Sequence, residues 1–267
     1  TYELVKETGE SPDGETLYES PADTARALAQ ISLGFFYQWA WPNGEVDLEW
    51  MEARCNWGRL VRHELACNSR EGYDSPKLIW NACSSNYMYG IQTNSELERA
   101  YLGWKAQCYK AAPPIMTNWL DTGVIHSALE EAYELEDCAI WYQSKAVAQM
   151  IEQLGCITYK SGDEINTNTL PRVAAFSVSA HGTGLNLQSY SNALVLEPPA
   201  SGLRWEQMLG RLHRPGQMKD EVNFHLLGHT PQLRRSFANA LEDSRYIQDS
   251  TQQPQKLQMA VKTKVRR

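Results

Sequence analysis

The sequence predicts an α/β fold, a parallel sheet flanked by helices, preceded by a mostly helical region. Short apolar runs at residues 138–142, 172–178 and 193–196 are typical of strands that are buried on both faces of a parallel sheet. Segments with apolar residues at helical spacing lie between and after these runs, which is the alternation expected of an α/β domain. Residues 24–135 instead hold most of the tryptophans and long helical patterns with few β-branched runs.

The α/β part begins with the strand at residues 138–142 and a helix at 144–154. Four apolar residues of that helix recur at helical spacing, as a helix packed on a sheet requires: Val147, Met150, Ile151 and Leu154. Residues 221–227 have the pattern of a further strand, and residues 232–247 that of a closing helix. We therefore expect one domain over residues 136–250.

Within the helical region, residues 25–37 and 50–65 show the clearest helical periodicity. The second segment carries an apolar stripe, which favours a core face over a platform for stacking bases: Trp50, Ala53, Trp57, Leu60, Val61 and Leu65. Trp39 and Trp41 flank a Pro-Asn-Gly turn, and we expect them to be more exposed because a turn cannot easily bury both indoles.

The expected organisation has four parts. They are a flexible acidic leader at residues 1–23, a mostly helical insertion domain at 24–135 with a proline-rich break at 111–114, the α/β domain at 136–250, and a basic tail at 251–267.

Two blocks in the α/β part carry residues suited to phosphate chemistry. Residues 177–187 place a Gly-x-Gly turn after a predicted strand, at the end where α/β proteins bind ligands. In the second block, residues 207–217, Arg211 and Arg214 are three positions apart behind a plausibly helical run, which puts both guanidiniums on one helix face. Two planar, permanently charged groups aimed at one point suit a triphosphate, although a solvated basic helix end has the same pattern.

Taken in order, the two blocks resemble motifs V and VI of superfamily 2 helicases, and most closely those of the Swi/Snf-like ATPases. The resemblance rests on Gly182, Gly184, Asn186 and Leu187 in the first block, and on His213, Arg214, Gly216 and Gln217 in the second. The phrase Gln-Ile-x-x-Gly-Phe-x-Tyr at residues 30–37 also resembles helicases of phages and prophages. The resemblance implies that residues 136–250 form a RecA-like carboxyl-terminal helicase lobe. Departures from the Swi/Snf pattern are His181 in place of a small residue and Glu197 in place of aspartate.

The resemblance also implies the roles of the site residues. Arg211, Arg214 and Gln207 are expected to act in catalysis, and Gly182, Gly184, Asn186 and Gln217 to bind the nucleotide. Contacts to nucleic acid are expected from Gln143, Ser144, Ser179, His181 and Thr183. For His181, a loop histidine with a local hydrogen bond is the favoured alternative to any catalytic duty. No residue is expected to hold a metal.

The chain contains no Gly-x-x-x-x-Gly-Lys-Ser/Thr sequence and no plausible carboxylate pair after a fitting strand to hold Mg²⁺. In the resembled family those parts belong to an amino-terminal RecA-like lobe, which holds ATP and Mg²⁺ in the cleft between lobes. We therefore expect this chain to be a carboxyl-terminal part of a longer or two-part helicase, to act with that lobe in cis or in trans, and to be inactive alone.

The formal net charge of -7 is unusual for a protein that binds nucleic acid. The acids crowd residues 3–23 and 130–137, however, while residues 203–235 are locally basic, with Arg204 among their solvated surface charges. We expect nucleic acid, DNA rather than RNA, as a partner. The six cysteines form no CxxC pair and the chain has neither a signal peptide nor a long apolar run, so we expect free thiols, no membrane contact and a bacterial or phage-infected host cytoplasm.

Two other functions fit parts of the sequence. A non-catalytic nucleic-acid-binding or partner-docking module would retain the lobe fold without turnover. An unrelated α/β enzyme using His181 or His213 as a general base is less favoured, because no nucleophile with a supporting acid lies in a recognisable motif.

Overall fold

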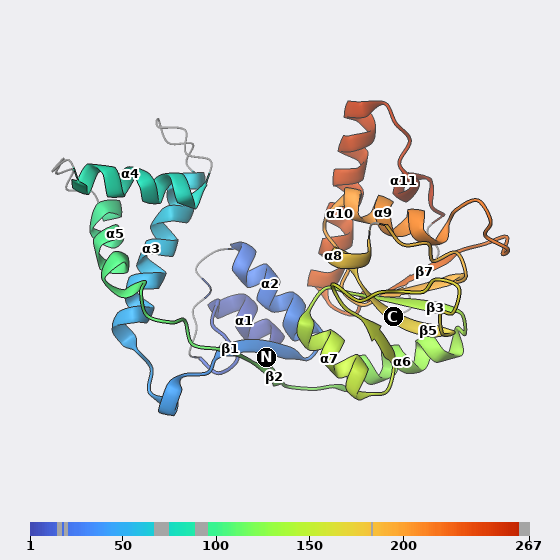
Figure 1. The fold of residues 1–267 in the computed structure, drawn as a ribbon, viewed down its shortest axis with the longest axis horizontal. Coiled ribbons are helices and arrows are strands. Elements are labelled where there is room, and N and C mark those ends of the chain that lie inside the picture. The colour runs from blue at the N-terminus through green and yellow to red at the C-terminus, as the bar shows by residue number, and fades with distance from the viewer. Residues whose placement is uncertain (15–17, 19–20, 67–74, 89–95, 183, 262–267) are drawn as a thin grey trace. The chain divides into compact units, whose positions relative to one another are not determined.

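The structure is a computed structural model that describes residues 1–261 except 15–17, 19–20, 67–74, 89–95 and 183 (Figure 1). The chain divides into two compact units. The α/β unit contains Thr1–Leu17, Ala22–Phe36 and Thr117–Arg267, and the helical unit contains Tyr18–Pro21 and Tyr37–Met116. The basic tail expected at the carboxyl terminus lies mostly outside the described residues.

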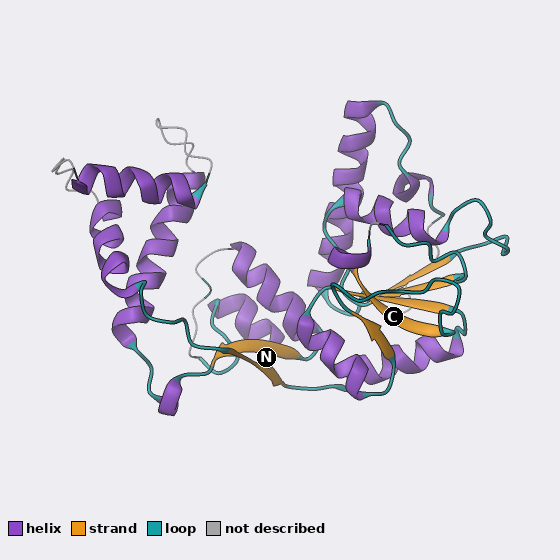
Figure 2. Cartoon of the chain, in the orientation of Figure 1, coloured by secondary structure: helices purple, strands orange, loops and turns teal. Residues whose placement is uncertain are grey.

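Five parallel strands form the sheet of the α/β unit in the order β4-β5-β3-β6-β7. Their bounds are Cys138–Tyr142 for β3, Ile157–Tyr159 for β4, Val173–Ser177 for β5, Asn192–Val195 for β6 and Asn223–Leu226 for β7. Figure 2 shows the strands as one layer with helices on both sides. The predicted fold class, a parallel sheet flanked by helices, is confirmed.

The central strands β3 and β5 are buried along their whole length, as their continuous apolar sequences predict. They pair in register, with Ala139 opposite Ala174 and Trp141 opposite Phe176. The alanine pair therefore lies beside the aromatic pair on one face of the sheet, and the Phe176 ring contacts both Trp141 and Tyr190.

Helices cover both faces of the sheet (Figure 1). α6 (Gly123–Glu134) and α7 (Lys145–Gln153) lie on one face, and α9 (Gly202–Leu212), α10 (Pro231–Thr251) and α11 (Lys256–Met259) on the other. α6 precedes the predicted domain start near residue 136, yet it packs against β3 and α7 with Ile125 and Ala132 fully buried. The boundary of the α/β unit therefore lies near residue 117, because α6 buries its apolar face on this sheet.

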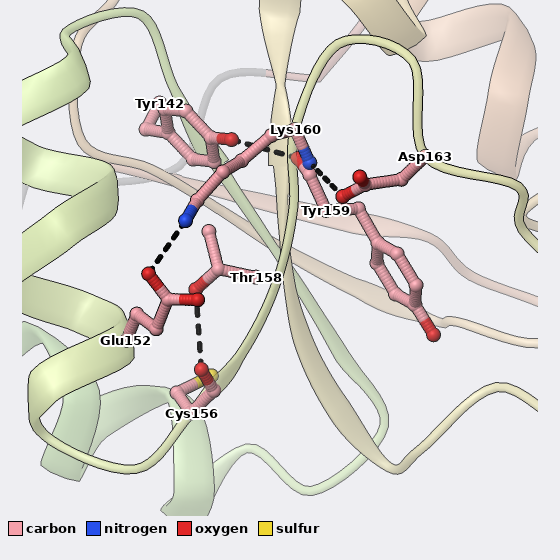
Figure 3. A network of polar contacts seen from close by, with 7 residues as sticks. All are labelled: Tyr142, Glu152, Cys156, Thr158, Tyr159, Lys160 and Asp163. Carbon is pink, nitrogen blue, oxygen red and sulfur yellow. Dashed lines mark hydrogen bonds and ion pairs between the residues drawn. The ribbon is translucent and has the colours of Figure 1, made fainter.

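A hydrogen bond joins the edge strand β4 to the end of β3, and an ion pair joins the residue after β4 to α7 (Figure 3). The Tyr142 hydroxyl donates to the Tyr159 carbonyl at 2.7 Å. Lys160 pairs with Glu152 of α7 at 2.6 Å, and its amide donates to Asp163 at 2.6 Å. Burial raises the pKa of Tyr142 to about 12, so the phenol remains a donor at neutral pH.

The acidic leader, expected to be flexible, instead contains α1 (Tyr2–Thr8). Val5 is fully buried, and the Tyr2 hydroxyl accepts a hydrogen bond at 3.1 Å from the amide of Gln232 in the first turn of α10. α2 (Pro21–Ser32) is held similarly, since a ring nitrogen of His229 lies 2.7 Å from the Ser32 carbonyl. Tertiary contacts thus order a segment whose local sequence is polar.

The helical unit consists of η1 (Pro42–Gly44), α3 (Leu48–Ala66), α4 (Pro76–Met88) and α5 (Glu96–Gln107). The predicted stripe on α3 is a core face: Trp57, Leu60 and Val61 are buried with Ile79 and Tyr101.

Trp39 and Trp41 are half-buried, each with its ring edge-on to Trp50 at 5.8 Å. The chain enters and leaves this part through a two-stranded sheet of β1 (Phe35–Trp39) and β2 (Ile115–Trp119), which the sequence analysis did not predict. Every helix among the described residues is too short or too polar to span a bilayer.

Candidate functional site

The predicted site residues gather around the carboxyl ends of β3, β5 and β6 and along α9. Gln143 and Ser144 follow β3, and α8 (Val178–His181) follows β5. Residues 184–191 contact α9 and the residues after it: the amide of Leu187 donates to the Arg211 carbonyl at 3.1 Å, and the Gln217 side chain donates to the Tyr190 carbonyl at 3.0 Å. The two helicase-like blocks are thus in contact.

Backbone geometry explains both glycines of the Gly-x-Gly turn. Gly184 has a φ of +87°, a left-handed conformation that other residues adopt only with strain. Gly182 has an ordinary φ, but a Cβ there would lie 2.5 Å from the Val178 carbonyl oxygen. Thr183 between them lies outside the described residues. Both glycines are therefore required by the turn itself, whether or not a ligand approaches it.

Arg211 ties α9 to this turn. Its Nε donates to the Gly182 carbonyl at 2.9 Å, and an NH1 hydrogen donates to the Leu185 carbonyl at 3.2 Å. Burial lowers the pKa of the guanidinium, and the nearby charge of Arg214 lowers it further. Two N–H donors of Arg211 are therefore engaged by backbone carbonyls, and the charge of Arg214 lies close enough to act on Arg211.

We call the contact between α9 and the Gly-x-Gly turn the junction, and Arg214 and Gln207 also belong to it. In the described part of the chain, Arg214 donates through Nε alone, to the Gly210 carbonyl at 2.7 Å. Gln207 Oε1 lies 3.7 Å from the position that a Cβ on Gly182 would occupy. Among the described residues neither Arg211 nor Arg214 forms an ion pair with a carboxylate. The junction therefore carries two adjacent positive charges that no described acid offsets.

Gln217 and Asn186 make hydrogen bonds within the protein. The Gln217 amide group donates to the carbonyls of Tyr190 at 3.0 Å and Leu212 at 3.2 Å, while its oxygen accepts from the Lys219 amide. Asn186 Oδ1 accepts from the amide of Gln188 at 3.4 Å. Gln217 fastens the loop to the end of α9, whereas the Asn186 bond stays within the loop. The expected contact of both side chains with a nucleotide stays a prediction.

Glu197, just after β6, is a site residue whose contacts the sequence did not predict. Its carboxylate accepts hydrogen bonds from the amides of Gln143 at 2.6 Å and Ser144 at 2.7 Å, and from the Ser144 hydroxyl. Burial raises the pKa of Glu197, and these hydrogen bonds partly offset the rise. The sequence shows an acid after a buried strand, but its partners depend on β6 lying beside β3.

The remaining predicted residues differ in exposure. Ser179 is exposed, and its hydroxyl lies 2.9 Å from that of Ser177, which caps α8. His181 is 6% exposed, packs edge-on against Phe176, and has no hydrogen-bond partner for Nδ1 among the described residues. His213, the other candidate general base, is exposed at the end of α9.

Burial of His181 predicts a loss of stability in acid. Burial lowers its pKa below 6.5, so the unfolded chain binds a proton at this residue more readily than the folded chain. The contribution of His181 is fully present above pH 6.5 and is lost as the pH falls through the lower, folded-state pKa. We expect His181→Leu to reduce the loss of urea stability between pH 7 and pH 5. An unchanged pH profile would show that the folded protein protonates this imidazole normally.

Comparisons with known proteins find likenesses among solved structures. No protein-family model and no curated protein matches the chain. Among solved structures, the chain is similar to one titled "Crystal structure of the C-terminal part of Fun30 ATPase domain", with 15% identity and a TM-score of 0.43 over 86% of this chain and 76% of that one.

Proposed function

We propose that this chain is the second motor lobe of an ATP-dependent helicase or translocase that acts on DNA. The observation that carries the proposal is the junction of the Gly-x-Gly turn with α9. There Arg211 donates hydrogen bonds to the carbonyls of Gly182 and Leu185, and Arg214 lies nearby without an acidic partner among the described residues. An amino-terminal RecA-like lobe, in cis or in trans, completes the ATP site.

The charges of the junction suit the terminal phosphate of ATP. Two adjacent guanidiniums offer donors and positive charge where negative charge grows during phosphoryl transfer. Mg²⁺ prefers carboxylate and other oxygen ligands, and the described residues contain no group of three or more His, Cys, Asp or Glu that could hold a metal ion, so we assign Mg²⁺ to the other lobe. Bound ATP supplies the phosphoryl group that is transferred to water.

Arg211 and Arg214 have different parts in this proposal. Arg211 holds the turn through two carbonyls and so acts mainly as a positioning residue. Among the described residues, the terminal nitrogens of Arg214 donate no hydrogen bond, and Arg214 is assigned as the arginine finger. Because the turn, α8 and β5 are continuous in sequence, lobe closure on ATP shifts the carboxyl edge of the sheet, which is the surface proposed to follow a nucleic-acid strand.

Reconstitution with the missing lobe tests the proposal. We expect the purified 267-residue chain to hydrolyse no ATP above background at saturating DNA, because it has no phosphate-binding loop with a lysine. Adding or fusing the encoded upstream lobe should create hydrolysis that DNA stimulates. Turnover by this chain alone contradicts the shared site. A reconstituted pair that binds ATP and DNA but never hydrolyses supports a non-catalytic docking or binding module instead.

A further inference from the structure

The strand order places a topological switch point at the carboxyl edge of the sheet, between β3 and β6. These strands are neighbours, but the chain leaves β3 into α7 on one face and leaves β6 into α9 on the other face (Figure 1). Where two such connections diverge, an α/β sheet has a natural ligand-binding crevice. We call Gln143, Ser144, Glu197 and Arg204 the switch-point cluster, since contacts among them connect these two diverging segments.

Glu197 holds the two residues that follow β3, Gln143 and Ser144. Its carboxylate holds two consecutive backbone amides and the Ser144 hydroxyl, and its backbone carbonyl accepts from Gln143 Nε2 at 2.9 Å. The Ser144 hydroxyl is therefore engaged by the protein. The Gln143 side chain, although exposed, is held in one orientation by its bond to the Glu197 backbone.

Gln143 in turn orients Arg204 on the α9 side. Gln143 Oε1 accepts a hydrogen bond from NH1 of Arg204 at 3.2 Å, across the switch point. Arg204 is exposed, and among the described residues it forms no ion pair with an acid. The bond to Gln143 occupies one NH1 hydrogen and leaves the rest of the planar fork facing solvent.

We propose that Arg204, oriented by Gln143, binds a phosphodiester group of a nucleic-acid strand that crosses the switch point. This rests on the nucleic-acid side of the proposed function and assigns the contact to a residue of α9. A guanidinium matches phosphate oxygens with two parallel hydrogen bonds, which a lysine cannot do. Gln143 is then a positioning residue, and Ser144 and Glu197 hold it in place.

The test measures binding of the full chain to a fluorescein-labelled single-stranded deoxyoligonucleotide by anisotropy, across a series of salt concentrations and without ATP. We expect Arg204→Gln to weaken binding about fivefold and to lower the log–log salt slope by about 0.7, the value for one lost phosphate contact on a single strand. Arg204→Lys keeps the charge and should keep the slope while losing part of the affinity.

The matched control removes the same charge from the opposite edge of the sheet. Arg172 is exposed, immediately precedes β5 and pairs with Glu136 at 2.7 Å. Arg172→Gln should leave affinity within about twofold and the salt slope unchanged, because surface pairs contribute little. An equal slope change in both variants would mean that only net charge matters, which overturns the proposal.

Positioning by Gln143 is tested with a double-mutant cycle. Gln143→Met should weaken binding about threefold in the wild-type chain but have no effect in the Arg204→Gln chain, because its contribution passes through Arg204. Additive effects contradict the positioning role.

Unlabelled ATP serves as a competitor at constant ionic strength. If ATP displaces the oligonucleotide from the wild type but not from Arg204→Gln, the residue binds a nucleotide phosphate and the phosphodiester assignment is wrong. A chain that binds no oligonucleotide also overturns this inference, whereas the motor proposal is decided separately by ATP hydrolysis with the upstream lobe.

Discussion

Replacing Arg214 by lysine should lower the kcat of the reconstituted two-lobe enzyme by about 10³-fold or more, the scale of an arginine finger. Lysine retains the charge but loses the planar fork, whose terminal nitrogens donate no hydrogen bond to any described residue. Such an interaction is made mainly in the transition state, so ATP affinity measured without turnover should change little. Steady-state hydrolysis and equilibrium nucleotide binding, measured on the same preparation, check both parts.

Two further substitutions serve as a control and as a comparison for Arg214→Lys. Arg172→Lys alters an exposed arginine at the opposite edge of the sheet and should leave kcat unchanged. Arg211→Lys should lower the free energy of unfolding, measured in urea, by about 1 kcal/mol, because the carbonyls of Gly182 and Leu185 lose their donors. Arg214→Lys should leave this free energy unchanged. Near wild-type kcat in Arg214→Lys removes the finger assignment and leaves this arginine as an ordinary helix end.

The elements predicted well are those whose signal is local. The strand β3 matches its predicted range, and α7 differs from its prediction by one residue at each end, because a continuous apolar run and a helical stripe are properties of the segment itself. The α3 stripe is likewise a core face. In each case the pattern of burial repeats the pattern of apolar residues, so no knowledge of the partner element is needed.

The elements predicted poorly depend on distant partners. β2 has no buried residue and no apolar run, and it forms a strand because it pairs with β1. The helices α3, α4 and α5 separate the two strands in the sequence. α6 looks like the helices before it, and only its packing on β3 places it in the α/β unit. The order of α1 depends on Val5 and on the contact of Tyr2 with α10.

The candidate site divides in the same way. The sequence predicted that the glycine turn and the arginine helix act together, and the bonds from Arg211 to the turn join them. It did not distinguish Arg211 from Arg214, because their difference lies in which carbonyls they reach. Nor did it identify the contacts of Glu197, whose hydrogen bonds require β6 to lie beside β3. Strand order, a non-local property, decides what this carboxylate does.

Gly34→Ala should lower the free energy of unfolding by about 4 kcal/mol or more, far beyond the usual effect of a substitution by alanine. Gly34 has a φ of +86°, and a Cβ there would lie 1.7 Å from the carbonyl oxygen of Asp121. The Gly34 carbonyl also accepts hydrogen bonds from the amides of Leu120 at 2.7 Å and Asp121 at 3.1 Å. In the alanine variant the backbone at residue 34 must therefore move away from Asp121, which strains or breaks both hydrogen bonds.

Gly155 provides a matched control for that substitution. Its φ of +84° is nearly the same, but a Cβ there would meet nothing within 4 Å. Gly155→Ala should therefore cost only the left-handed conformation itself, about 1 kcal/mol. Urea unfolding followed by far-ultraviolet circular dichroism compares the two variants directly. Equal losses would show that the approach of Asp121 to Gly34 places no constraint on the fold. A much larger loss at Gly34 identifies its close approach to Asp121 as a structural requirement of the fold where β1 and β2 meet.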